Sequence, residues 1–332
     1  MASLRGQPLP RATARFTNAL RPWVQRRWAT ESNEIDGMLK KKTKWEAFPD
    51  SIRKLAVFAE HARSHNYQIP LLSKAQSGAG EFDQTKAYHI AAAIRQLREM
   101  NGEVVAGRKI GFTNTNIWHE YGIGESNWSY MYQNTIIDLP SCEEITQGKT
   151  MLADLRSLNA MEPRIEPEIT LGLKSVPRPD MNDLDILSCI EWIAHGFEIV
   201  ASVFPHWKFT AADTTAAFAL HGLLLVGPRK MLRGNADATF LQSLQDFEVR
   251  LYRDGKELDS GHGHNVLGSP IKALRHLTEL LAKDEYNKPL EAGEVVTTGT
   301  LTRAFPIRNG EHWSTKLKGL DLPGLNLRFR TE

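Results

Sequence analysis

The sequence predicts an α+β protein in which a helical N-terminal region leads into a mixed, strand-dominated domain. Before about residue 103 apolar residues recur at helical spacing. From residue 104 onward the chain changes to short apolar runs separated by turn signals, which is typical of strands. The 332 residues contain 41% hydrophobic and 24% charged side chains, so a disordered or collagen-like chain is excluded.

Residues 1–28 differ in composition from the rest, with six arginines, no lysine and no acid. On a helical wheel the apolar side chains share one arc and four of the arginines lie on the opposite arc. This pattern predicts a transit peptide that directs the chain to the mitochondrial matrix. The alternative is a basic tail that binds nucleic acid or a membrane surface. Removal of the six arginines would change the formal net charge of the chain from +2 to about −4, which argues against a nucleic-acid partner.

Residues 29–103 are predicted to be the helical N-terminal region. One helix is expected over residues 51–65, where Ile52, Leu55 and Phe58 would face inward. A second helix is expected to begin at Asp83 and to end before Gly102, because glycine commonly follows the last turn of a helix.

Residues 104–332 are predicted to form the catalytic domain. Strands are expected at 168–173, 197–203 and 294–300, and a helix is expected at 184–193. Asp254-Gly255 predicts a hairpin, and Ser269-Pro270 predicts the start of a helix. No apolar run approaches the roughly 20 residues that span a membrane, so no membrane span is expected. Two cysteines are too few for a disulfide framework.

Three glutamates suggest a metal site. Glu166 and Glu168 are two residues apart in an apparent strand, so their side chains would emerge on the same face. Glu198 lies between Phe197 and Ile199 in another apolar strand. Converging carboxylates repel one another unless a cation neutralises them, and an all-oxygen site suits Mg²⁺ or Mn²⁺. The alternative is the solvated face of an edge strand.

Six blocks in order give the sequence a resemblance to the hydratase/decarboxylase branch of the fumarylacetoacetate hydrolase superfamily. The blocks are RKIGFT at 108–113, EPEI at 166–169, FEIVAS at 197–202, ADT at 212–214, VLGSP at 266–270 and TTGTLT at 297–302. The resemblance implies a mixed β-sandwich roll with a helical N-terminal region. It also implies that Glu166, Glu168 and Glu198 hold Mg²⁺ or Mn²⁺.

The resemblance assigns further residues to a substrate site. Lys109 would meet the substrate carboxylate, although a lysine on a strand is ordinarily a solvated charge. Thr298, Gly299 and Thr300 would line the pocket, and their alternative is an ordinary turn. Asn127 stands where relatives carry an acid and cannot act as an ionised base.

Three histidines are candidates for proton transfer. His221 could replace the proton-transfer capacity that is lost at Asn127, or it could pack beside Leu220. His262 and His264, in a glycine-rich loop, are alternative acid/base candidates.

The resemblance implies a metal-dependent hydratase that adds water to a 2-hydroxy-2,4-dienoate or 2-oxo-4-enoate. Alternatives are a decarboxylase of a 4-oxalocrotonate-like 2-oxo diacid, which Asn127 favours, and an acylpyruvate-type C–C hydrolase. A non-catalytic binding protein is a further alternative. The expected partner is a small-molecule 2-oxo acid, and the chain is expected to form a homo-oligomer.

Overall fold

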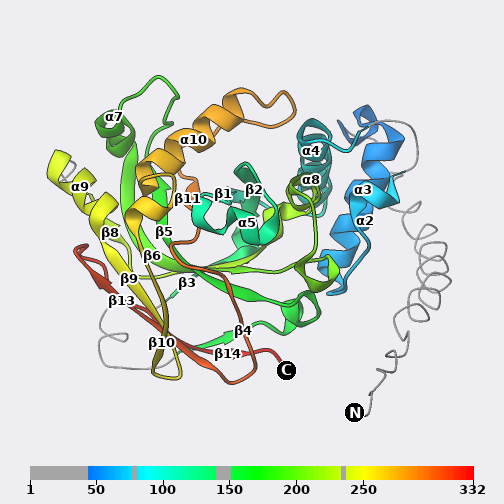
Figure 1. Ribbon diagram of the computed structural model, residues 1–332. Helices are drawn as coiled ribbons and strands as arrows, with labels where there is room; N and C mark the ends of the chain where they lie inside the picture. The colour runs from blue at the N-terminus through cyan, green and yellow to red at the C-terminus, as the bar shows by residue number, and fades with distance from the viewer. Residues whose placement is uncertain (1–43, 77–80, 140–150, 233–236) are drawn as a thin grey trace, which may run out of the picture. The chain divides into compact units, whose positions relative to one another are not determined.

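The structure is a computed structural model that describes residues 44–76, 81–139, 151–232 and 237–332 (Figure 1). The chain divides into two units, Met1–Glu46 and Ala47–Glu332. In the first unit, residues 44–46 begin the 3₁₀ turn η1 (Lys44–Ala47). The predicted segment 1–28 lies outside the described residues.

Helices precede the first strand in the second unit, as the sequence predicts, and further helices lie between the strands. The helices are α2 (Asp50–Ser64), α3 (Leu72–Ala75), α4 (Gln84–Met100), α5 (Trp118–Tyr121), α7 (Asp183–Ser188), α8 (Ala211–Ala216), α9 (Ala238–Asp246) and α10 (Pro270–Ala282). The N-cap of α4 is Asp83, whose carboxylate accepts a hydrogen bond from the Lys86 backbone N–H. The N-cap of α10 is Ser269, whose hydroxyl accepts a hydrogen bond from the Lys272 N–H, which confirms the predicted cap.

Two sheets make up the strand-rich part. In the nine-stranded sheet the order is β2-β1-β11-β5-β6-β7-β3, with β12 beside β5 and β8 beside β6. Its strands are β1 (Val105–Gly111), β2 (Asn127–Tyr132), β3 (Ile136–Asp138), β5 (Arg164–Leu173), β6 (Ile190–Val200), β7 (His221–Val226), β8 (Lys230–Met231), β11 (Val295–Thr297) and β12 (Phe305–Pro306). β1 pairs with β11, and β3 with β7, in parallel; the other pairs are antiparallel.

The five-stranded sheet has the order β10-β9-β13-β14-β4. Its strands are β4 (Met151–Asp154), β9 (Glu248–Arg253), β10 (Lys256–His262), β13 (His312–Lys318) and β14 (Asn326–Arg330). β9 and β10 form the predicted hairpin, in which Asp254 and Gly255 both have positive φ. The mixed α+β class is confirmed.

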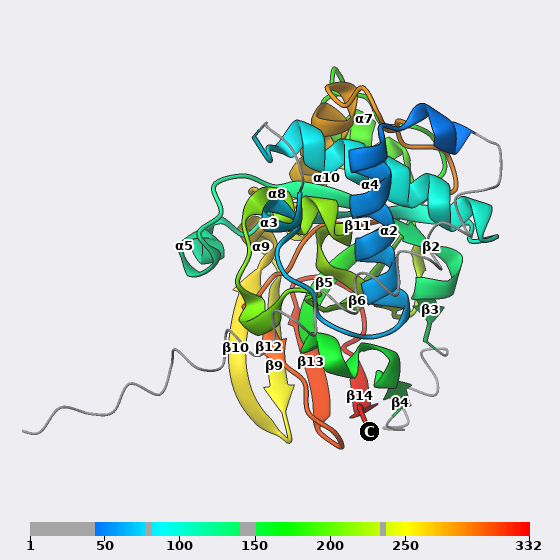
Figure 2. The same ribbon diagram turned by 90° about the vertical axis from the view of Figure 1, so that its right-hand side faces the viewer.

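A large apolar core joins the nine-stranded sheet to α10 and to the five-stranded sheet. It contains Ile169 and Leu171 from β5, Leu274 and Leu277 from α10, and Val249 from β9. Figure 2 shows the five-stranded sheet below the helices, with α2 and α4 crossing in front. α4 packs against both α2 and α8, and α8 in turn contacts strand β2.

The predicted helix over 184–193 is wrong in its second half. α7 ends at Ser188, and Ile190 already belongs to strand β6. The apolar residues from Ile190 onward are buried on both faces of a central strand, so their spacing imitates a helical pattern. All three expected strands also differ in length, because β5 begins at Arg164, β6 runs from Ile190 to Val200, and β11 ends at Thr297.

Candidate metal and substrate site

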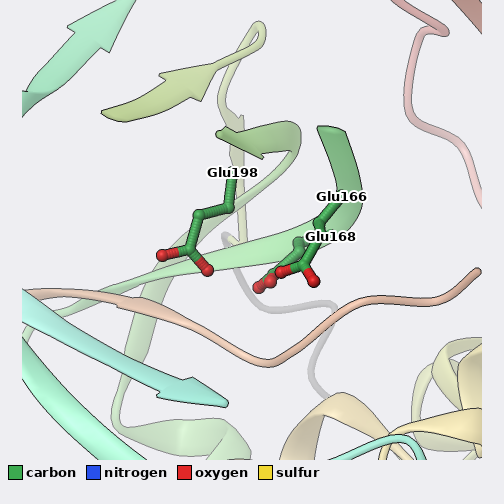
Figure 3. Close-up of side chains that lie close together, drawn as sticks. All are labelled: Glu166, Glu168 and Glu198. Carbon is green, nitrogen blue, oxygen red and sulfur yellow. The ribbon is translucent and has the colours of Figure 1, made fainter. Parts of the chain in front are cut away.

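The three glutamates converge from the two central strands of the nine-stranded sheet. Glu166 lies directly opposite Glu198 in the β5–β6 register, and Glu168 lies opposite Gly196. One carboxylate oxygen from each glutamate lies within 4.8 Å of the other two (Figure 3). Glu168 and Glu198 are fully buried, whereas Glu166 is partly buried. The cross-strand register therefore produces the cluster.

The electrostatics of the cluster suit a divalent cation. Burial raises the pKa of Glu166 to about 7, and burial together with Glu198 and Glu166 raises the pKa of Glu168 well above its usual value. Glu168 Oε1 is buried without a hydrogen-bond partner among the described residues. Its other oxygen, Oε2, accepts a 2.8 Å hydrogen bond from the Gly299 N–H. A hard cation would replace the missing donors and relieve the repulsion among three carboxylates.

Lys109 approaches the cluster from β1. Its Nζ lies 3.3 Å from Glu198 Oε2 and donates a 2.9 Å hydrogen bond to the Ala219 carbonyl. Burial lowers the pKa of Lys109, but Glu198, Glu166 and Glu168 outweigh burial and hold that pKa above its usual value. Lys109 is therefore a buried charged donor, and the solvated alternative for this lysine is excluded.

His221, the first residue of β7, contacts the far side of Glu198. Its Nδ1 lies 2.8 Å from Glu198 Oε1, and its Nε2 lies 3.0 Å from Thr135 Oγ1. Burial raises the pKa of Glu198, but Lys109 and His221 outweigh burial and lower that pKa to about 2. This carboxylate is therefore ionised and can only accept hydrogen bonds. Burial also lowers the pKa of His221. A proton on Nδ1 lets His221 donate to Glu198, while the Thr135 hydroxyl donates its own proton to the Tyr132 carbonyl at 3.0 Å.

Residues 298–300, which directly follow β11, contribute the next part of the site. The Thr298 hydroxyl donates to the Ile169 carbonyl, and the Thr298 carbonyl accepts from Thr113. Gly299 has a φ of +97°, and a Cβ there would lie 1.7 Å from Thr113 Oγ1. Thr298 thus shapes the turn that aims the Gly299 N–H at Glu168, whereas Thr300 lines a cavity beside the cluster.

This cavity has polar and apolar walls. Its lining residues are Lys109, Gly111, Phe112, Glu166, Val200, Trp207, Ala219, Leu220 and Thr300. Four of them are non-glycine residues with positive φ: Phe112 (54°), Trp207 (54°), Ala219 (45°) and Leu220 (64°). Such backbone is costly, and surrounding packing must enforce it. Nothing in the sequence pattern indicates Trp207 or Ala219 at this site; the Ala219 contact is made by a backbone carbonyl, which no residue type signals.

The other residues that the sequence suggests for the substrate site lie in different parts of the fold. Asn127 is buried on β2, where its side-chain amide contacts α8. The rings of His262 and His264 stack on each other with centroids 5.0 Å apart, and neither lines the cavity. The structure thus groups Lys109 and His221 with the glutamates but does not bring the two later histidines to them.

The fold and this site define a member of a known enzyme family. Residues 148–322, more than half of the chain, match the family described as fumarylacetoacetate (FAA) hydrolase C-terminal, and the chain belongs to that family. The sequence is 28% identical over 235 residues to a 2-hydroxyhexa-2,4-dienoate hydratase of Comamonas testosteroni, covering 70% of this chain and 82% of the relative. It is 27% identical to a 2-keto-4-pentenoate hydratase of Paraburkholderia phymatum, covering 81% and 94%.

A solved structure has the same fold. It is a 4-oxalocrotonate decarboxylase from Pseudomonas putida G7, complexed with magnesium and adipate, which superposes with a TM-score of 0.70. The sequence identity is 22%, and the match covers 87% of this chain and 99% of the decarboxylase. The resemblance to the hydratase/decarboxylase branch is confirmed.

The predicted mitochondrial location is wrong. The hydratases that the chain resembles come from bacteria, which have no mitochondria. An arginine-rich amphipathic composition is a weak signal of an address, since basic segments of other kinds share it. Among the described helices, none combines the length and the apolar character needed to cross a lipid bilayer.

Proposed function

We propose that the protein is a divalent-metal-dependent hydratase that adds water to a 2-hydroxy-2,4-dienoate or 2-oxo-4-enoate. The observation that carries the proposal is the cluster of three carboxylates within 4.8 Å, with the charged Lys109 beside it. The hydratase names of the relatives support the reaction type. The carboxylate cluster and Lys109 together would suit a small, anionic 2-oxo acid.

Each part of the site has a chemical role in this proposal. Glu166, Glu168 and Glu198 would hold Mg²⁺ or Mn²⁺. When bound, the cation would supply Lewis-acid polarisation of the 2-oxo group. Lys109 would bind the substrate carboxylate, since it is a buried cation that lines the cavity. The apolar walls would surround the uncharged tail of the substrate and exclude bulk water.

The second candidate is a decarboxylase of a 4-oxalocrotonate-like 2-oxo diacid. Asn127 favours it, because a carboxamide cannot serve as an ionised base for water addition. Against it, Lys109 is the only cation that lines the described cavity, and a diacid carries two carboxylates.

Homo-oligomerisation stays a prediction, which light scattering would check.

Product analysis tests the proposal. Purified protein with Mg²⁺ or Mn²⁺ is mixed separately with 2-hydroxypenta-2,4-dienoate and with 4-oxalocrotonate. We expect loss of the dienoate absorbance with water gained, and little release of carbon dioxide. Glu168→Gln and Glu198→Gln should lower turnover by about a hundredfold or more, whereas the exposed Glu285→Gln should not. Turnover that survives both site substitutions would refute the metal-enzyme proposal.

A further inference from the structure

His195 of β6 is buried on the face of the nine-stranded sheet that is opposite the carboxylate cluster. Successive residues of a strand point to opposite faces, so His195 faces away from the side on which Glu198 and Gly196 lie. His195 is 1% exposed. Its Nδ1 lies 3.0 Å from the Glu168 carbonyl oxygen of β5, and its Nε2 lies 2.8 Å from Thr315 Oγ1 of β13. The ring therefore connects the strand of a candidate metal ligand with the five-stranded sheet.

The partners of His195 define where its proton lies. A main-chain carbonyl can only accept, so Nδ1 carries the proton that is donated to Glu168. The Thr315 oxygen already accepts a 2.9 Å hydrogen bond from the Leu325 N–H. Among the described residues, His195 Nε2 is the acceptor that lies within reach of the Thr315 proton. Thr315 therefore donates to Nε2, and the ring is held neutral in one tautomer and one orientation.

Glu168 depends on its main chain for its position more than Glu198 does. Both carboxylate oxygens of Glu198 have a basic side chain within 3.3 Å. The Glu168 carboxylate receives a hydrogen bond from the Gly299 N–H, and its Oε1 is buried without a partner among the described residues. A carboxylate with so few contacts of its own follows any rotation of its backbone. The contact of His195 with the Glu168 carbonyl limits that rotation from the opposite face of the sheet.

Packing between the sheets does not by itself require a polar ring at this position. Phe197, on the same face of β6, is a fully buried apolar ring whose centroid lies 5.6 Å from that of His195. Burial of an imidazole costs free energy unless its nitrogens are hydrogen-bonded. We infer that His195, held by Thr315, is a positioning residue that fixes the Glu168 main chain so that the Glu168 carboxylate faces the metal. This inference rests on the proposed function and makes metal affinity depend on strand β13 of the other sheet.

Two substitutions of His195 keep different halves of this arrangement. Asparagine places an amide N–H near the position of Nδ1, so His195→Asn keeps the donor to Glu168 and loses the contact with Thr315. Glutamine reaches the position of Nε2, so His195→Gln keeps the contact with Thr315 and loses the donor to Glu168. By calorimetry, we expect Mn²⁺ affinity to fall about tenfold in His195→Gln and no more than about threefold in His195→Asn. The electron paramagnetic resonance spectrum of bound Mn²⁺ should change in His195→Gln alone.

Thr315 provides a second test that leaves His195 in place. Thr315→Val removes the hydroxyl and should weaken Mn²⁺ binding about fivefold or more, whereas Thr315→Ser keeps the hydroxyl and should keep the wild-type affinity. Thr278→Val is a matched control, because Thr278 is also buried and its hydroxyl donates to the Arg275 carbonyl within α10. In chemical denaturation the control should be less stable than the wild type, with unchanged Mn²⁺ affinity.

The outcomes separate this inference from the proposed function. The same Mn²⁺ affinity and spectrum in His195→Gln and His195→Asn would show that His195 only links the two sheets, and the inference would be overturned. The same affinity in Thr315→Val and Thr315→Ser would overturn it as well, and this pair decides if the His195 variants do not fold. If the folded wild type binds no Mn²⁺, the proposed function itself fails.

Discussion

His221 Nδ1 lies 2.8 Å from Glu198 Oε1, on the side of that carboxylate that faces away from Lys109. The other oxygen, Oε2, is the one that Lys109 approaches at 3.3 Å. One oxygen of Glu198 is therefore occupied by the histidine, and the other is left for the cluster. Partners of this kind orient metal ligands in many proteins.

Substitution of His221 should distinguish its two contacts. Asparagine places an amide N–H near the position of Nδ1, whereas glutamine places its amide near Nε2. We expect His221→Gln to weaken Mn²⁺ binding about tenfold or more and His221→Asn to weaken it much less. Calorimetric titration gives both values. Equal losses in the two variants would mean that the Glu198 contact does not orient the ligand.

Metal-free protein should become less stable as the pH rises from 6 to 8. Burial raises the pKa of Glu166 to about 7, and the pKa of Glu168 is raised well above the usual value of 4.5. At these two carboxyls the folded state binds more protons than the unfolded chain over this range, so they make stability decrease with pH. The lowered pKa values of the buried His195 and His221 offset part of this decrease near pH 6. For Glu166 the loss between pH 6 and pH 8 is about 1.4 kcal/mol, because the rest of the change occurs below pH 6, where the unfolded chain has already released its proton. Glu198 has a lowered pKa and affects stability only at more acidic pH.

Thermal melting in EDTA and in Mg²⁺ checks this expectation. The Tm in EDTA should be lower at pH 8 than at pH 6, and Mg²⁺ should restore most of the difference, since the cation replaces the protons. In Glu166→Gln the decrease should be smaller. A Tm in EDTA that rises with pH in the wild type, with the same slope in Glu166→Gln, would contradict the assigned pKa shifts.

Removal of Lys109 should separate metal binding from catalysis. Lys109 is a positive charge 3.3 Å from a carboxylate that would bind the cation, so it opposes a second positive charge at the cluster. We expect Lys109→Met to bind Mg²⁺ at least as tightly as the wild type but to lose turnover by about a hundredfold or more. Titration and a rate assay on the same preparation provide the comparison. Weaker Mg²⁺ binding in Lys109→Met would show that the lysine supports the site rather than the substrate.

Gly299→Ala should damage the site more than an equally strained control. Gly293 also has a positive φ, of 88°, but a Cβ there meets nothing within 4 Å. Both substitutions pay roughly 1–2 kcal/mol for the left-handed backbone. Gly299→Ala adds the overlap with Thr113 and shifts the N–H that binds Glu168, for a further cost of roughly 1–3 kcal/mol.

Chemical denaturation and Mg²⁺ titration measure the two effects of the glycine substitutions. Only Gly299→Ala should weaken Mg²⁺ binding. The same loss of stability in both variants, with unchanged Mg²⁺ affinity, would show that the turn does not position Glu168.

Local patterns were sufficient for much of the fold. The helical spacing of Ile52, Leu55 and Phe58 predicts α2, and Asp254-Gly255 predicts the hairpin that the structure contains. Alternation along one strand predicts that Glu166 and Glu168 share a face. The same reasoning failed at Ile190, because a strand buried on both faces loses its alternation.

The amino-acid sequence by itself determined which residues could carry a charge or a hydrogen bond, and which of them alternate along one strand. Only the tertiary structure decided that Glu198 lies opposite Glu166, that Lys109 meets the Ala219 carbonyl, and that α8 fixes the amide of Asn127. The reason is physical: helix and strand periodicity arise from neighbouring residues, whereas register between strands and the burial of each polar atom depend on segments far apart in the chain.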